Sequence, residues 1–177
     1  DEVAPSITSG ATAIAIDENS GAGQVVYTAT ADDSADISGG VTFSLKSGNN
    51  DDASAFGINA STGEVTLTAD PNHETKASYS FTVVATDAAG NASEKTVSLN
   101  INDLDEVAPS ITSGAVASAI DENSGSGQVI YTATADDTAD ISGGVTFSLK
   151  ADNGDDASAF SINASTGAVT LTGNPDY

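Results

Sequence analysis

The chain has 177 residues, of which 38% are hydrophobic and 5% aromatic, and it contains no Cys, Met or Trp. Asp and Glu outnumber Lys and Arg by 26 to 4, so the formal net charge is −22, which disfavours nucleic acid and anionic membranes as partners. The absence of Cys excludes disulfides and thiolate metal sites, and no apolar run is long enough to insert into a membrane.

Short β-strands are predicted along the first hundred residues, because apolar and polar residues alternate there with a period of two. Val25 and Tyr27 begin one such row, and Val41, Phe43 and Leu45 form the next. The strands are expected at 6–16, 24–31, 41–46, 54–58, 64–68, 78–86 and 94–102. Clusters of Gly, Asn and Asp separate them, and no segment keeps a period of 3.6. About seven short strands in about 100 residues indicate an all-β, Ig-like Greek-key β-sandwich.

The chain contains an internal repeat with an offset of 104 residues. The segment 1–10 reads DEVAPSITSG and recurs unchanged at 105–114, and 59 of the 73 positions aligned between 1–73 and 105–177 are identical. We therefore expect two tandem sandwiches, with repeat 1 at 1–104 and a truncated repeat 2 at 105–177.

Repeat 2 has no counterpart in this chain to the strands predicted at 78–86 and 94–102. Its sandwich is therefore expected to lack its last two strands and to expose the apolar row of Val145, Phe147 and Leu149. Strands supplied by another polypeptide, or a remainder of the chain beyond Tyr177, would complete it.

The many carboxylates have two interpretations, a solvated acidic surface or a set of ligands for a divalent cation. Calcium requires six to eight oxygen ligands, and no single loop here has the spacing of an EF-hand. The ligands of a calcium site would therefore have to come from several loops, and a β-sandwich gathers its loops at its two ends.

Several motifs resemble those of the cadherin repeat family and occur in the family's order. They are Ile16-Asp17-Glu18-Asn19, Ala29-Thr30-Ala31-Asp32-Asp33, Phe56-x-Ile58 with Thr62-Gly63, Asn72-His73-Glu74, Ala85-Thr86-Asp87-Ala88-Ala89-Gly90-Asn91, and the linker Asp103-Leu104-Asp105-Glu106-Val107-Ala108-Pro109. The resemblance covers all of repeat 1 and all that is present of repeat 2. It implies that Ca²⁺ ions are held where successive repeats join.

The resemblance also implies which residues hold the metal. From repeat 1 and the linker they are Glu18, Asn72, Glu74, Asp103, Leu104, Asp105, Glu106 and Val107, and from repeat 2 they are Asp136 and Asp137. Three positions depart from the family pattern, because Asn72 replaces an Asp, Glu106 replaces an Asp, and Asp136 and Asp137 are adjacent. Asp140 could substitute for one of the adjacent pair. A second, half-formed site is expected from Asp1, Glu2, Asp32, Asp33 and Asp87.

Nothing in the sequence supports an enzyme. The chain has no Arg and no G-x-S-x-G motif, and His73, its single His, is expected to be structural or exposed. Glu18 and Glu74 could in principle act as a glycosidase pair, but their identification with the recurrent calcium motifs argues against that role.

The sequence favours a structural function. Near-identical copies suit a calcium-rigidified extender module of a bacterial cell-surface or secreted adhesin, which mediates cell adhesion by projecting other domains. Its partners would be the neighbouring repeats of the same polypeptide, and its location extracellular. The alternative is a calcium-dependent binding module for a protein or polysaccharide, although Trp is absent and only four Tyr are present.

Overall fold

The computed structural model describes residues 2–35, 37, 39–48, 51–151 and 154–176. The chain forms two compact units, Asp1–Leu104 and Asp105–Tyr177, which are treated separately below. The prediction of an all-β fold is confirmed: the helices among the described residues are two 3₁₀ turns, Ala53–Ala55 and Ala157–Ala159. No helix in that part of the chain is long and apolar enough to cross a bilayer.

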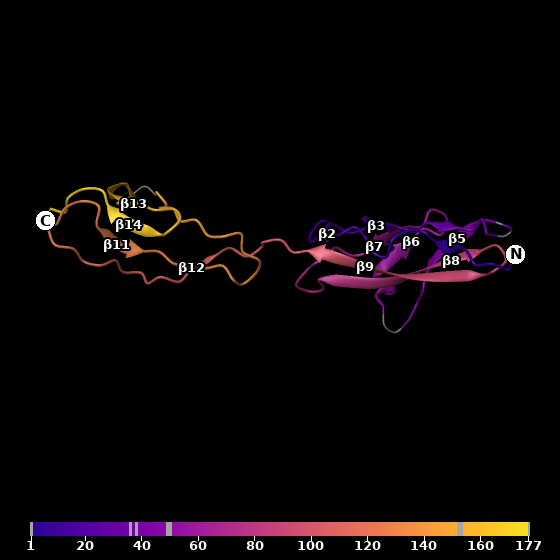
Figure 1. Cartoon of the computed structure of the whole chain (residues 1–177). Coiled ribbons are helices and arrows are strands. Elements are labelled where there is room, and N and C mark those ends of the chain that lie inside the picture. Colours follow the sequence, from indigo (N-terminus) through magenta and orange to yellow (C-terminus); the bar gives the residue numbers. More distant parts are fainter. Residues whose placement is uncertain (1, 36, 38, 49–50, 152–153, 177) are drawn as a thin grey trace. The chain divides into compact units, whose positions relative to one another are not determined.

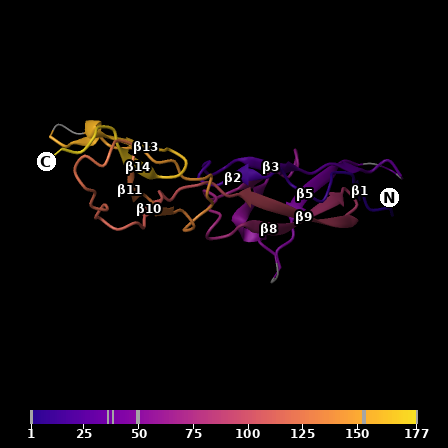
Figure 2. The same ribbon diagram turned by 60° about the vertical axis from the view of Figure 1, so that its left-hand side comes forward.

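The larger sheet of the first unit contains four strands in the order β2-β9-β8-β5. Their bounds are β2 Ile16–Asp17, β5 Val41–Leu45, β8 Ser78–Asp87 and β9 Ala92–Asn102. The long strands β8 and β9 form an antiparallel hairpin, seen in Figures 1 and 2, and β2 joins the edge of β9 in parallel. The short connection 88–91 suits a hairpin, because Gly90 adopts a φ of 95° that other residues rarely reach.

The facing sheet of the first unit has the order β3-β7-β6, and a separate pair joins β1 to β4. Their bounds are β1 Ser6–Ile7, β3 Val25–Thr28, β4 Ala31–Asp32, β6 Phe56–Ile58 and β7 Glu64–Leu67. The core fills the space between the sheets. Phe81 of β8 is fully buried and contacts Tyr27 and Phe56, with ring centroids 5.9 and 4.5 Å away.

Three predicted strands of the first unit differ from the structure. The strand expected at 24–31 is divided between β3, Val25–Thr28, and the start of β4, Ala31–Asp32, which belong to different sheets. The strand expected at 6–16 is split, because the chain leaves its pairing with β4 after Ile7 and reaches β9 only around Thr12, where a parallel bridge to Ser98 forms. The residues expected to begin the strand at 54–58 lie instead in the 3₁₀ turn Ala53–Ala55.

The alternation that places Val25 and Tyr27 in one apolar row is interrupted in the structure. The pairing of β3 with β7 shifts register between Val25 and Tyr27, as a β-bulge does. Both Val26 and Tyr27 consequently face the core, with 0% and 6% exposure, whereas Val25 is 49% exposed.

The second unit reproduces the smaller sheet of the first but not the larger one. Its strands are β10 Ser110–Ile111, β11 Val129–Thr132, β12 Ala135–Asp136, β13 Phe160–Ile162 and β14 Ala168–Leu171. They form a β11-β14-β13 sheet and a β10-β12 pair (Figure 1). The segment 145–149 has the same sequence as β5 but forms no strand, because the hairpin that pairs with β5 in the first unit has no counterpart among the described residues of the second.

Candidate metal site

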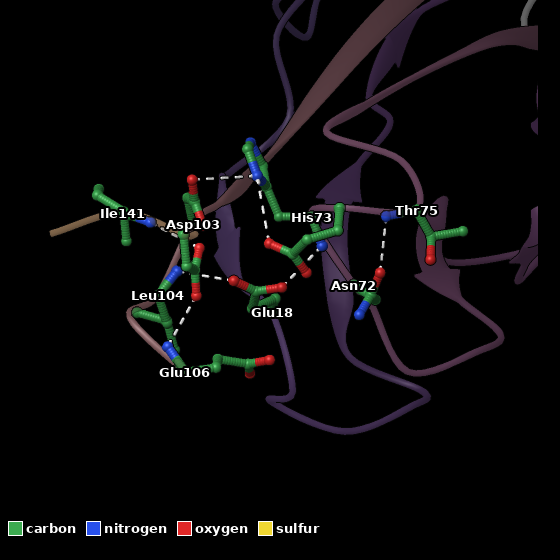
Figure 3. A network of polar contacts seen from close by, with 10 residues as sticks. Glu18, Asn72, His73, Thr75, Asp103, Leu104, Glu106 and Ile141 are labelled. Atoms are coloured by element: carbon green, nitrogen blue, oxygen red, sulfur yellow. Dashed lines mark hydrogen bonds and ion pairs between the residues drawn. The ribbon is translucent and has the colours of Figure 1, made fainter. Parts of the chain in front are cut away.

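Glu18 is a buried acidic residue at the end of the first unit where β2 and β9 finish. Its side chain is 1% exposed, Oε2 accepts a 2.8 Å hydrogen bond from the backbone N–H of His73, and Oε1 accepts one of 2.7 Å from that of Leu104 (Figure 3). The Leu104 and His73 amides outweigh the effect of burial and lower the pKa of Glu18. The carboxylate is therefore a fixed negative charge.

Three further side chains converge beside Glu18. The ligand atoms of His73, Glu74 and Asp103 all lie within 4.8 Å of one another. His73 Nδ1 is 3.3 Å from Asp103 Oδ2 (Figure 3). The same nitrogen is 3.9 Å from Glu74 Oε1. The other oxygen of Asp103, Oδ1, is buried and has no hydrogen-bond partner among the described residues.

The unpartnered Oδ1 of Asp103 is consistent with a metal site. A buried carboxylate oxygen without a hydrogen-bond donor is energetically unfavourable unless a cation or water reaches it. Carboxylates are the oxygen donors that calcium prefers. The donor set of Glu74 and Asp103, with Glu18 behind them, therefore fits a hard divalent cation. His73 offers a nitrogen, which calcium does not favour.

Asn72, one of the expected ligands, makes a structural contact. Its Oδ1 accepts a 2.7 Å hydrogen bond from the backbone N–H of Thr75 and so stabilises the turn that carries His73 and Glu74 (Figure 3). The sequence predicts that His73 is structural or exposed. Its backbone does have a structural role, but its ring also lies among the carboxylates. Its position next to Glu74 in the sequence was the signal for that placement.

Of the remaining linker residues, Leu104 ends the first unit and Asp105, Glu106 and Val107 begin the second. The side chains of all four are exposed. The backbone N–H of Glu106 donates a 2.8 Å hydrogen bond to Oδ2 of Asp140, whose Oδ1 accepts another from the Ile141 amide. Asp140 thus fixes the start of the second unit through these hydrogen bonds. This structural role is separate from the metal-binding role that the sequence suggests for Asp140.

Asp136 and Asp137 of the second unit are engaged locally. Oδ1 of Asp136 accepts hydrogen bonds from the hydroxyl and amide of Thr138, which lower the pKa of Asp136. Oδ2 of Asp137 accepts one from the hydroxyl of Ser142. Within the described part of the second unit, these residues do not gather into a group of three metal-ligating side chains.

The second expected site draws on β4 and β8 of the first unit. Asp87 is 6% exposed; burial opposes its ionisation, but hydrogen bonds from Asn91, Gly90 and Ala89 prevail and lower its pKa. Oδ1 and Oδ2 of Asp87 each lie 2.8 Å from a nitrogen of Asn91.

Two other members of that site differ in their surroundings. Oδ1 of Asp32 accepts a hydrogen bond from Ser34, whereas Oδ2 of Asp33 is buried without a hydrogen-bond partner among the described residues. Glu2 is exposed, and Asp1 lies outside the described residues.

Comparison with known proteins agrees with the resemblance to cadherin repeats. The family described as "Cadherin domain" matches residues 12–102. Protocadherin Fat 2 of Rattus norvegicus is 30% identical over 124 residues, which are 69% of this chain and 3% of that protein. The chain thus spans a small fraction of the length of this relative.

Solved structures show the same likeness. The crystal structure of human protocadherin-24 EC1-2 has a TM-score of 0.71 and 25% identity, covering 99% of this chain and 80% of that one. The structure of mouse cadherin-23 EC22-24 has a TM-score of 0.65 and 25% identity, covering 98% of this chain and 55% of that one.

Proposed function

The chain belongs to the cadherin domain family, and on this premise we propose that it is a calcium-rigidified, extracellular extender module of a surface or secreted adhesin, without enzymatic activity. Its near-identical repeats favour this role, because a spacer depends on length and stiffness rather than on individual surfaces. The relatives named above are animal proteins, so a bacterial parent is proposed only on the resemblance of the Ala- and Thr-rich strands without Cys to bacterial versions of the repeat.

The observation that carries the calcium part of the proposal is the unpartnered Oδ1 of Asp103. Asp103 directly follows β9, and Glu74 lies in the turn that precedes β8. Glu18, Glu74 and Asp103 would hold the ion, which supplies positive charge between carboxylates that otherwise repel one another.

Calcium would then connect three segments that meet at this end of the first unit. They are the turn after β2, the turn at 72–75 and the start of the linker. We include Asp105, Glu106, Val107, Asp136 and Asp137 as additional ligands on the family resemblance. Their contribution would fix the linker and so stiffen the tandem array.

A calcium titration of the complete chain tests the proposal. Extracellular calcium modules bind with dissociation constants of about 10⁻⁴–10⁻³ M. A ligand at 100 times its dissociation constant stabilises the folded form by about 2.7 kcal/mol. We expect thermal unfolding of the first unit to shift upward by many degrees between excess chelator and excess calcium.

Two variants with the same change of charge locate the site. Asp103→Asn should weaken calcium binding at least about tenfold, because it removes the charge of a proposed ligand. Glu94→Gln, an exposed change near the other end of β9, should leave the affinity unchanged. Superimposable melts with calcium and with chelator would refute the proposal.

A further inference from the structure

The ring of His73 brings a nitrogen donor to two carboxylates of the first unit. Nδ1 of His73 lies 3.3 Å from Oδ2 of Asp103 (Figure 3). The same nitrogen lies 3.9 Å from Oε1 of Glu74, and the ligand atoms of the three side chains are all within 4.8 Å of one another. Calcium prefers oxygen donors, so the proposed calcium site does not use this nitrogen.

One imidazole and two carboxylates form a donor set that suits Zn²⁺. Zinc binds His nitrogen and carboxylate oxygen at about 2.0–2.2 Å, with its ligands at the corners of a tetrahedron. Neighbouring ligand atoms are then about 3.3–3.6 Å apart. The distance between Nδ1 of His73 and Oδ2 of Asp103 already lies in this range. Oε1 of Glu74 is slightly too far from Nδ1, a difference that its half-exposed side chain can close.

The backbone that carries these donors is fixed by hydrogen bonds within the first unit. The amide of His73 donates to Oε2 of Glu18, and the amide of Leu104, the residue after Asp103, donates to Oε1. Two hydrogen bonds to Asn72, one to its side chain and one to its carbonyl, close the turn that carries His73. The donors are therefore preorganised, so a metal that binds them orders little further structure.

An ion pair between a protonated His73 and Asp103 would give the same contact. It would engage Oδ2 of Asp103 and leave Oδ1 buried without a hydrogen-bond partner among the described residues. A divalent cation at the carboxylate removes this cost, because it stabilises the charge that both oxygens share. The side chains of His73 and Asp103 are 29% and 28% exposed, so an ion in solution can reach them.

The nitrogen donor belongs to repeat 1 alone within this chain. His73 is its single His, and the equivalent position in repeat 2, 104 residues later, is Tyr177. The usual zinc ligands in proteins are Cys, His, Asp and Glu. Exchange of His73 for Tyr is therefore a change that the repeats themselves suggest, and it removes the nitrogen while every carboxylate remains.

We propose that His73, Glu74 and Asp103 form a site for Zn²⁺ or a similar transition-metal ion, with water completing the coordination. Glu74 and Asp103 are shared with the proposed calcium site, so the two metals exclude each other and zinc displaces calcium from this end of the first unit. The competition rests on the proposed function, whereas the zinc site itself rests on the three side chains.

Nitrogen-15 NMR of the complete chain tests the site, because a single His gives one pair of ring signals. Zinc chloride is added to the calcium-free chain at about pH 8, where imidazoles are ordinarily neutral. The Nδ1 signal of His73 should shift as the metal binds, while Nε2 keeps its proton. Calcium chloride, titrated separately, should not produce this shift, because calcium does not bind the ring.

Two variants assign the donors by calorimetric titration. His73→Tyr should weaken zinc binding at least about tenfold, because one of three protein ligands is lost. It should leave calcium binding unchanged, since the backbone N–H that donates to Glu18 is retained, and that binding also shows that the variant is folded. Asp103→Asn should weaken the binding of both metals.

Competition between the metals provides a separate measurement. With zinc at 100 times its dissociation constant, the apparent dissociation constant for calcium should rise about a hundredfold in the unmodified chain. The same zinc concentration should have a much smaller effect on His73→Tyr. If calcium binds and zinc at His73 leaves its affinity unchanged, the shared site is overturned.

Two results would overturn the zinc site itself. One is a set of His73 ring signals that does not move in a large excess of zinc. The other is equal zinc affinity of His73→Tyr and the unmodified chain, because zinc would then be bound by carboxylates elsewhere. A chain that binds zinc through His73 but binds no calcium would refute the proposed function and leave the zinc site standing.

Discussion

The carboxylate of Glu18 accepts a 2.7 Å hydrogen bond from the backbone N–H of Leu104, a residue 86 positions further along the chain. The contact fixes the end of β9 to the turn that follows β2. A second amide, that of His73, donates to the other oxygen of the same carboxylate. One buried acidic side chain therefore organises the three segments that present the candidate metal ligands.

We expect Glu18→Gln to destabilise the first unit even without calcium. The substitution replaces one acceptor oxygen by an NH₂ group that faces a backbone N–H, so one of the two amides loses its acceptor. The midpoint of thermal unfolding in chelator should fall by several degrees. Glu122→Gln is the matched control, because Glu122 occupies the equivalent position in the second unit but is exposed. Equal effects of the two changes would contradict this account of Glu18.

Acid should destabilise the first unit. The pKa values of Glu18 and Asp87 are lowered from ordinary values of 4.5 and 3.8. The unfolded chain binds these protons more tightly, so their contribution to stability is complete above about pH 4.5 and is lost as the pH falls through the folded pKa values. Urea unfolding in chelator between pH 7 and pH 3 measures this. A free energy of unfolding that stays constant over that range would refute the prediction.

Gly63→Ala should be strongly destabilising. Gly63 has a φ of 73°, and a Cβ atom there would lie 2.3 Å from the carbonyl oxygen of Ala29. We expect a loss of at least about 2 kcal/mol in the free energy of unfolding. Gly21→Ala is the control for backbone conformation alone, since Gly21 has a φ of 93° but no atom near its added Cβ. Its cost should be about 1–2 kcal/mol. Similar losses for both would show that the close approach to Ala29 does not matter.

The β-bulge in β3 predicts opposite results for adjacent valines. Val26→Ala should cost about 2 kcal/mol, because Val26 is fully buried. Val25→Ala should cost less than about 0.5 kcal/mol, because Val25 is 49% exposed. Chemical unfolding of both variants measures the difference. A larger loss of stability for Val25→Ala than for Val26→Ala would contradict the bulge and support the simple alternation that the sequence suggests.

Much of the fold follows from local sequence. The alternation in Val41, Phe43 and Leu45 is enough to predict β5, and the longer row from Tyr79 to Ala85 predicts β8, because a side chain on every second residue faces the core. The recurrence of 1–73 at 105–177 predicts two similar units and the incomplete sheet of the second. The motif order was sufficient for the cadherin resemblance.

Only the tertiary structure decided the rest, because it depends on contacts between distant residues. The division of 6–16 between two sheets is set by pairing with β4 and β9, and the bulge at Val26 by pairing with β7. The ring of His73 lies near Asp103 because β9 ends beside the turn at 72–75. Residue type identified the acidic side chains. Which of their oxygens are already bonded, and which, like Oδ1 of Asp103, are not, was determined by the packing of segments far apart in the chain.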